Sequence, residues 1–123
     1  KKGIKIMKKL FIYLDDERNI PDNYKRYFKN WGINFIILRT YQSVIDYLTK
    51  YRPIDAKIYL SFDHDLGLNK TGYDVAKFIV ENQISINGFA VHSMNPVGAK
   101  NIIELLTHYG YHQMKTLNEI TQD

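Results

Sequence analysis

Polar side chains that can hold metal ions, bind phosphate or transfer protons follow three short apolar segments of the chain. The apolar segments span residues 10–14, 58–62 and 89–91. The polar residues behind them are Asp15 and Asp16, then Asp63, His64 and Asp65, and finally His92 and Ser93. Each apolar run is typical of a strand that is buried on both faces of a parallel sheet. Ligand sites of such sheets lie beyond the carboxyl ends of the strands, so we expect the polar side chains to converge there.

Four carboxylates in this group indicate a cation site. They belong to Asp15, Asp16, Asp63 and Asp65. Carboxylates held together without a counter-charge repel one another, and a divalent cation relieves that repulsion. Oxygen ligands favour Mg²⁺ or Mn²⁺, and the nearby histidines also admit Zn²⁺, which we rank below these two. We predict that these four acids hold a divalent cation with positions left open for phosphate oxygens.

A phosphate site is predicted beside the cation. Asn95 and Pro96 read as an N-cap followed by a proline at the first helical position. The helix that starts here offers free backbone N–H groups and the positive end of its dipole to an anion. The hydroxyl group of Ser93 adds a further donor. We therefore predict Ser93 and Asn95 as the residues that bind the phosphate of a substrate.

Two histidines and an aspartate are the predicted catalytic residues. A phosphodiester hydrolase needs a base that activates water and an acid that protonates the departing oxygen, and His64 and His92 could divide these roles beside Asp63. Structural alternatives remain open. The aspartate pair could cap a helix, and each histidine could be an ordinary packed or loop residue. Ser93 and Asn95 could be plain capping residues.

The rest of the pattern predicts an α/β fold. Two further candidate strands lie at 33–38 and 111–117, which gives five in chain order: 10–14, 33–38, 58–62, 89–91 and 111–117. Segments with helical periodicity separate them. This order predicts a doubly wound sheet of five parallel strands, a three-layer sandwich of the flavodoxin type with strand order 2-1-3-4-5. Because only six residues follow the fifth run, the last helix should be short or missing.

Composition fits one globular domain. The chain has 123 residues, a formal net charge of +4 and no cysteine, which excludes disulfides, thiolate metal sites and cysteine nucleophiles. Five lysines lie in residues 1–9, and without them 12 basic residues face 13 acidic ones. We therefore divide the chain into a basic leading segment, 1–9, and an α/β domain, 10–123. No apolar run reaches the roughly 18 residues of a membrane span, and we expect a cytoplasmic protein.

Three sequence blocks resemble the cyclic-phosphate processing receiver-like family, an offshoot of the receiver domains of response regulators. They read LDDER at 14–18, SFDHDLG at 61–67 and HSMNPVGAKN at 92–101. The resemblance spans about residues 10–110. It implies a receiver-like fold and an activity on cyclic phosphates in RNA or nucleotide metabolism.

Individual residues in these blocks match functional positions of receiver domains. Asp15 and Asp16 match the metal-binding acids of receivers, and Asp63 matches their phosphorylated aspartate. His92 or Ser93 falls where receivers carry a threonine or serine after the fourth strand. A histidine directly after the phosphorylated position and a His-Ser-x-Asn-Pro block are departures from receivers, and both favour chemistry at the site over signalling.

These observations leave two main hypotheses for function. The first is a metal-dependent phosphoesterase that opens a cyclic phosphate on an RNA end or a cyclic nucleotide. The second is a receiver-type switch without enzymatic activity, which is phosphorylated at Asp63 and signals to a partner. A module that binds a cyclic nucleotide without cleaving it is a third alternative.

Overall fold

A four-stranded parallel sheet forms the centre of the protein. The computed structural model describes residues 8–122, so the predicted leading segment 1–9 lies almost entirely outside the described residues. The strands are β1 (Lys9–Leu14), β2 (Asn34–Leu38), β3 (Lys57–Phe62) and β4 (Gly88–Val91). They lie in the order β2-β1-β3-β4, with all neighbours parallel. The predicted α/β class, parallel pairing and relative strand order are confirmed for these four strands.

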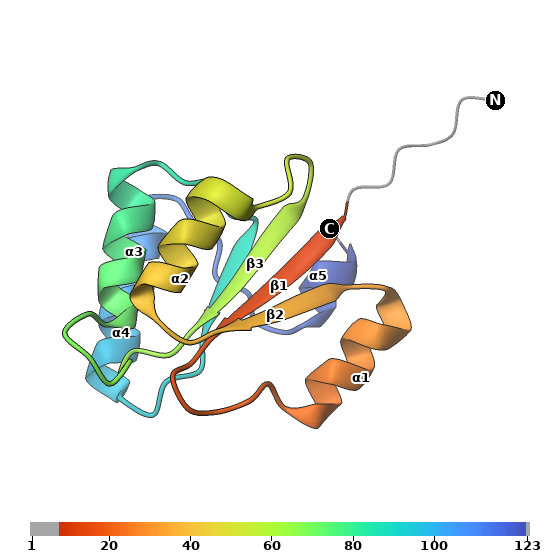
Figure 1. Cartoon of the computed structure of the whole chain (residues 1–123), viewed down its shortest axis with the longest axis horizontal. Coiled ribbons are helices and arrows are strands. Elements are labelled where there is room, and N and C mark those ends of the chain that lie inside the picture. Colours follow the sequence, from red (N-terminus) through yellow and green to blue (C-terminus); the bar gives the residue numbers. More distant parts are fainter. Residues whose placement is uncertain (1–7, 123) are drawn as a thin grey trace.

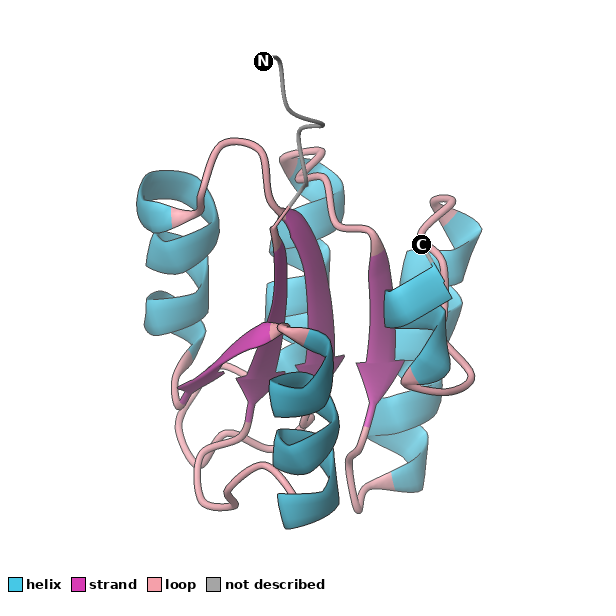
Figure 2. Cartoon of the chain, turned by 90° about the vertical axis from the view of Figure 1, so that its right-hand side faces the viewer, coloured by secondary structure: helices cyan, strands magenta, loops and turns pink. Residues whose placement is uncertain are grey.

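Helices cover both faces of the sheet (Figures 1 and 2). On one face lie α2 (Tyr41–Asp46), with its π-helical continuation Tyr47–Tyr51, α3 (Gly72–Glu81) and α4 (Pro96–His108). The other face carries α1 (Asp22–Trp31) and the short α5 (Asn118–Gln122). Two apolar clusters, one on each side of the sheet, hold these layers together. The three-layer arrangement and the short last helix agree with the sequence prediction.

The predicted fifth strand is wrong. Residues 112–114 run beside β4, where Phe89 N donates to His112 O at 2.9 Å and Met114 N donates to Phe89 O at 2.7 Å. A single isolated bridge between Phe89 and Gln113 is the only ladder element formed within the described part of this segment. Two polar residues separate each apolar residue from the next in 111–117, whereas a strand inside a parallel sheet needs a continuous apolar run. The chain therefore turns into α5 after one bridge.

Local sequence signals start the helices that border the site. Thr40 caps α2 and Thr71 caps α3, each by accepting a hydrogen bond from the backbone three residues ahead. Asn95 caps α4 with Pro96 at the first helical position, as predicted. Within residues 8–122, no helix combines the length and apolar character that crossing a bilayer requires.

Candidate functional site

The ends of β1 and β3 bring two acidic segments together. Leu14 pairs with Phe62 in the register of these strands, and Asp63 N donates to Leu14 O at 2.9 Å. The residues that follow each strand are therefore neighbours. Carboxylate oxygens of Asp15, Asp16 and Asp63 all lie within 4.8 Å of one another. The convergence expected from the strand ends is present for these three acids.

Asp15 lies at the centre of the group and is fully buried. Its Oδ1 accepts the backbone N–H groups of Glu17 at 2.9 Å and Arg18 at 2.7 Å. Its Oδ2 accepts Arg18 Nε at 3.0 Å and His92 Nε2 at 3.1 Å. Burial raises the pKa of Asp15, but the hydrogen bonds from Arg18, Glu17 and His92 outweigh burial, and the pKa lies below its ordinary value. Asp15 is therefore ionised at neutral pH.

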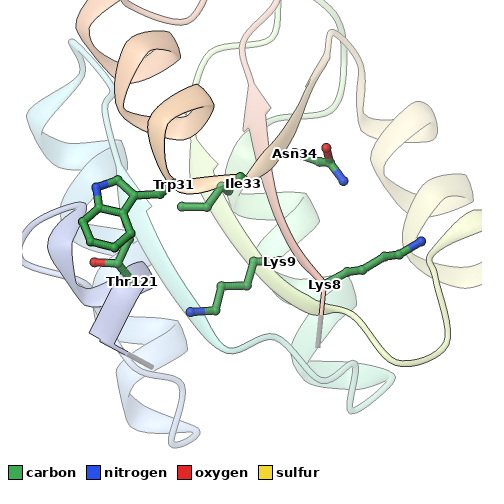
Figure 3. Close-up of a pocket in the computed structure, with 7 residues that line it drawn as sticks. Lys8, Lys9, Trp31, Ile33, Asn34 and Thr121 are labelled. Carbon is green, nitrogen blue, oxygen red and sulfur yellow. The ribbon is translucent and has the colours of Figure 1, made fainter. Parts of the chain in front are cut away.

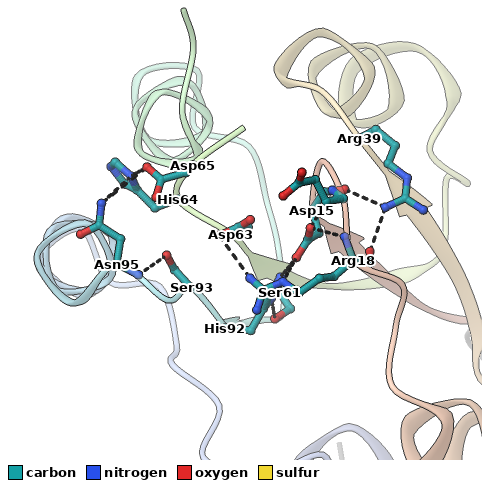
Figure 4. Close-up of polar contacts among 11 residues, drawn as sticks. Asp15, Arg18, Arg39, Ser61, Asp63, His64, Asp65, His92, Ser93 and Asn95 are labelled. Atoms are coloured by element: carbon teal, nitrogen blue, oxygen red, sulfur yellow. Dashed lines mark hydrogen bonds and ion pairs between the residues drawn. The ribbon is translucent and has the colours of Figure 1, made fainter. Parts of the chain in front are cut away.

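His92 connects Asp15 to the interior of the sheet (Figure 4). Its Nδ1 lies 2.8 Å from Ser61 Oγ, and its ring stacks on Tyr13 with centroids 4.1 Å apart and planes 8° from parallel. Burial lowers the pKa of His92, and the opposing effect of Asp15 does not restore it. A neutral ring satisfies this network when Nε2–H donates to Asp15 and the Ser61 hydroxyl donates to Nδ1. Both ring nitrogens of His92 are thus engaged.

Asp63 borders an open cleft. Its carboxylate is nearly buried, and Arg18 Nη2 lies 3.6 Å from Asp63 Oδ1. Burial, followed by the nearby negative charge of Asp15, raises the pKa of Asp63 above its ordinary value. The cleft has a volume of about 670 Å³ and is lined by Asp16, Glu17, Arg18, Asp63, Asp65, Gly67 and Met94. A partly buried acid with a raised pKa at the wall of a cleft is suited to accept a proton.

His64 takes a different direction from its neighbour Asp63. Its Nδ1 lies 2.9 Å from Asp65 Oδ1 and 3.5 Å from Asn95 Nδ2 (Figure 4). The ring packs so closely on Gly98 of α4 that a side chain at Gly98 would overlap it. The structure therefore brings His92, but not His64, to the three carboxylates, and it places Asp65 with His64 outside that group.

The two predicted phosphate-binding residues have structural partners at the start of α4. The Ser93 hydroxyl accepts Asn95 N–H at 3.0 Å, and Asn95 Oδ1 accepts Gly98 N–H at 2.9 Å. These are the capping contacts that the sequence left open as an alternative. Met94, between them, is exposed and lines the cleft.

Three residues that the sequence reading did not select have contacts in the site. Arg18 bridges Asp15 and Asp63, and Ser61 holds His92. Arg39, directly after β2, donates to the backbone oxygens of Asp15 at 3.2 Å and Arg18 at 2.8 Å. A lone hydroxyl inside the apolar run 58–62 was the available signal for Ser61, because a buried polar group needs a partner.

Asp16 and Asp63 fit a divalent cation better than Asp15 does. None of the described residues donates a hydrogen bond to the Asp16 carboxylate, and a side chain at Gly67 would come within 2.8 Å of Asp16 Oδ2. Four donors already occupy Asp15, which matches the number of lone pairs that a carboxylate offers. Asp16 and Asp63 thus offer hard oxygen ligands, and Asp15 offers one only after a donor leaves.

A separate cavity of about 310 Å³ lies at the opposite edge of the sheet. Lys8, Lys9, Trp31, Ile33, Asn34 and Thr121 line it (Figure 3). It adjoins the beginning of β1, whereas the acids follow the end of that strand. The exposed Trp31 and the charge of Lys8 make it a different chemical environment from the acidic cleft.

A family model matches most of the chain. A model of the family described as the cyclic-phosphate processing receiver domain matches residues 10–108. No curated protein matches the chain.

Solved receiver structures share the fold at low sequence identity. A CheY-like response regulator receiver domain from Methanospirillum hungatei JF-1 aligns with a TM-score of 0.62 at 15% identity, covering 95% of this chain and 93% of that one. The signal receiver domain of a putative Luxo repressor protein from Vibrio parahaemolyticus aligns with a TM-score of 0.61 at 17% identity, covering 95% and 85%. The Mn²⁺-bound form of response regulator Rcp1 aligns with a TM-score of 0.50 at 16% identity, covering 93% and 87%.

Proposed function

We propose that this chain, which belongs to the cyclic-phosphate processing receiver domain family, is a phosphoesterase that opens a cyclic phosphate with the help of a divalent cation. The substrate would carry its cyclic phosphate on an RNA end or on a nucleotide. The family match supports the class of substrate, and the acids at the ends of β1 and β3 support the cation.

The contact between His92 and Asp15 carries the proposal. It joins a histidine to the acid cluster through Nε2 and Asp15 Oδ2 at 3.1 Å. The contact helps to keep the Asp15 carboxylate ionised, and burial together with that negative charge raises the pKa of the neighbouring Asp63. Hydrolysis must take one proton from water and deliver one to the departing oxygen, and an acid with a raised pKa is suited to both steps. The contact between His92 and Asp15 therefore supports hydrolysis through its effect on Asp63.

The cation would be held by Asp16 and Asp63, and by Asp15 once a donor has left its carboxylate, with Mg²⁺ or Mn²⁺ as the metals that prefer such ligands. The Mn²⁺-bound form of Rcp1, which shares the fold, supports this choice. When bound, a divalent cation supplies neutralisation of phosphate charge and activation of water at neutral pH.

Asp63 is the group that we assign to accept the proton of the attacking water, because its pKa is raised. His92 holds Asp15 in its ionised form and in a fixed orientation, since its own two nitrogens are engaged. In the reaction, the water oxygen forms a bond to phosphorus and one ring P–O bond breaks. Asp63 then passes the proton that it accepted to the departing oxygen, so the product is a phosphate monoester with a free hydroxyl group, and Asp63 is ionised again.

Turnover of a defined panel tests the proposal. The protein is incubated with Mg²⁺ or Mn²⁺ and with 2′,3′-cyclic nucleotides or RNA oligonucleotides that end in a cyclic phosphate, and products are followed by ³¹P NMR. We expect a monoester product from the wild type and none from Asp63→Asn. Asp22→Asn, an acid exposed at the start of α1, is the matched control and should retain activity. Absence of product across the panel from folded protein would overturn the proposal.

A receiver-type switch is the second candidate, and the position of Asp63 favours it. Asp63 directly follows β3 and lies beside the acids that follow β1. Treatment with acetyl phosphate should then add one phosphoryl group to the wild type and none to Asp63→Asn. Intact-mass measurement detects this covalent acyl phosphate on the protein, whereas hydrolysis of a cyclic phosphate releases a soluble product.

A further inference from the structure

The guanidinium group of Arg18 occupies the space between two acids of the site. Its Nε lies 3.0 Å from Asp15 Oδ2, and its Nη2 lies 3.6 Å from Asp63 Oδ1. Both carboxylates are nearly inaccessible to solvent, whereas the Arg18 side chain is 44% exposed. Arg18 therefore supplies positive charge where we place a divalent cation.

A cation that uses Asp15 must displace a donor from Oδ2. His92 is the donor that stays, because stacking on Tyr13 and the contact with Ser61 fix its ring. Arg18 is the donor that can leave, because its long side chain is partly exposed at the cleft. Its backbone need not move, since Asp15 Oδ1 accepts Arg18 N–H and Arg39 donates to Arg18 O. Only the side chain has to swing.

We propose that Arg18 is a phosphate-binding residue that exchanges with the cation: the guanidinium pairs with Asp15 and Asp63 in the cation-free site, and cation binding releases it to bind the substrate phosphate. This inference rests on the proposed cation and phosphate site. The planar fork of a guanidinium matches two phosphate oxygens, and Arg18 already lines the cleft. The Arg18 side chain pairs with two of the three clustered carboxylates, those of Asp15 and Asp63.

Cation affinity tests the exchange without any turnover. Mn²⁺ binding is measured by electron paramagnetic resonance for the wild type, for Arg18→Gln and for Arg26→Gln. Arg26 is exposed on α1, so its replacement removes the same charge away from the site. We expect Arg18→Gln to bind Mn²⁺ about tenfold more tightly than the wild type, because no charge-assisted bond has to break, and Arg26→Gln to differ by less than about twofold. Equal affinities of the two variants would overturn the exchange.

A measurement on the wild type makes the test independent of how Arg18→Gln folds. The ¹H–¹⁵N signal of Arg18 Nε–H reports its bond to Asp15. Addition of Mg²⁺ should shift this signal and speed its exchange with water, while the side-chain signals of Arg39 stay in place. A shifted Asp16 amide signal shows that the cation site is saturated. If the Arg18 Nε–H signal stays in place at saturation, the proposal is overturned.

Inorganic phosphate tests the second half of the proposal. With Mg²⁺ at saturation, we expect Arg18→Gln to bind phosphate about tenfold more weakly than the wild type and Arg26→Gln to differ by less than about twofold. Equal phosphate affinities of the two variants would remove the phosphate-binding role. Neither binding measurement needs a chemical step. The exchange of Arg18 can therefore be confirmed in a protein that does not hydrolyse cyclic phosphates, and it can be refuted in one that does.

Discussion

The His92 ring lies parallel to the Tyr13 ring, 4.1 Å from centroid to centroid, between the buried Ser61 hydroxyl and the Asp15 carboxylate. Tyr13 belongs to β1 and Ser61 to β3, and the two residues pair in the sheet. The ring that reaches the acids is thus held by the two central strands.

Replacement of His92 by alanine should destabilise the fold. The change removes an aromatic stack and a hydrogen bond to an ionised acid, and we expect a loss of about 2–3 kcal/mol in the free energy of unfolding, measured with urea. His108→Ala is the matched control, because His108 also contacts a tyrosine ring, Tyr109 at 4.9 Å, but is exposed. That control should lose less than about 0.5 kcal/mol. Equal losses would contradict the network around His92.

Asp15 should contribute stability that depends on pH. Its folded-state pKa is depressed because hydrogen bonds to the ionised form outweigh burial. The contribution is therefore complete above the ordinary pKa of 3.8 and is lost as the pH falls through the lower folded value. We expect Asp15→Asn to cost about 2–3 kcal/mol at neutral pH, and the difference from the wild type to shrink in acid. Unfolding curves at a series of pH values measure this, and a difference independent of pH would contradict it.

Ionisation of Asp63 should destabilise the fold, in contrast to ionisation of the neighbouring Asp15. Burial and the neighbouring Asp15 charge raise its folded-state pKa, so ionisation of Asp63 costs stability once the pH exceeds that value. We expect Asp63→Asn, without added cation, to be about 0.5–2 kcal/mol more stable than the wild type at neutral pH. The gain should vanish below the ordinary pKa of 3.8, where both states are protonated. A variant that is less stable at neutral pH would show that the Asp63 charge is favourable in the fold.

The contrast between His92 and His64 shows which parts of the site the sequence could predict. Apolar runs identify where buried strands end, and the parallel register then places Asp15, Asp63 and His92 together. The direction of a side chain in the loop beyond a strand depends on packing that no periodicity encodes. His64 turns away because Gly98 of α4 leaves room for its ring.

The sequence pattern also did not predict two contacts between segments that are far apart in the chain. Arg18 pairs with Asp63, and Arg39, at the end of β2, donates to the backbone oxygen of Asp15. The fold itself was predictable except for the segment after α4. There, the apolar residues are too widely spaced for a buried strand, and the chain makes one bridge to Phe89 before α5.

The fluorescence emission of Trp31 should show at which edge of the sheet a ligand binds. It is the only tryptophan of the chain, is 61% exposed and lies with Lys8 at the cavity beside the beginning of β1. The acids are about 20 Å away, the length of a six-residue strand. We expect a cyclic mononucleotide with Mg²⁺ to leave Trp31 emission unchanged. Quenching by the mononucleotide would place its binding at the Lys8 cavity and contradict the acidic cleft as its site.

Gly98 and His64 should be coupled energetically. A Cβ atom at Gly98 would overlap the His64 ring, and the three nearest atoms to it all belong to that ring. Gly98→Ala should therefore cost about 1–3 kcal/mol in the wild type, although alanine favours a helix by about 1 kcal/mol over glycine. In a His64→Ala background the clash is absent, and the same change should stabilise the protein. Urea unfolding of the four proteins of this cycle measures the coupling. Additive effects would show that His64 does not pack on α4, and would return it to the candidates for proton transfer in the cleft.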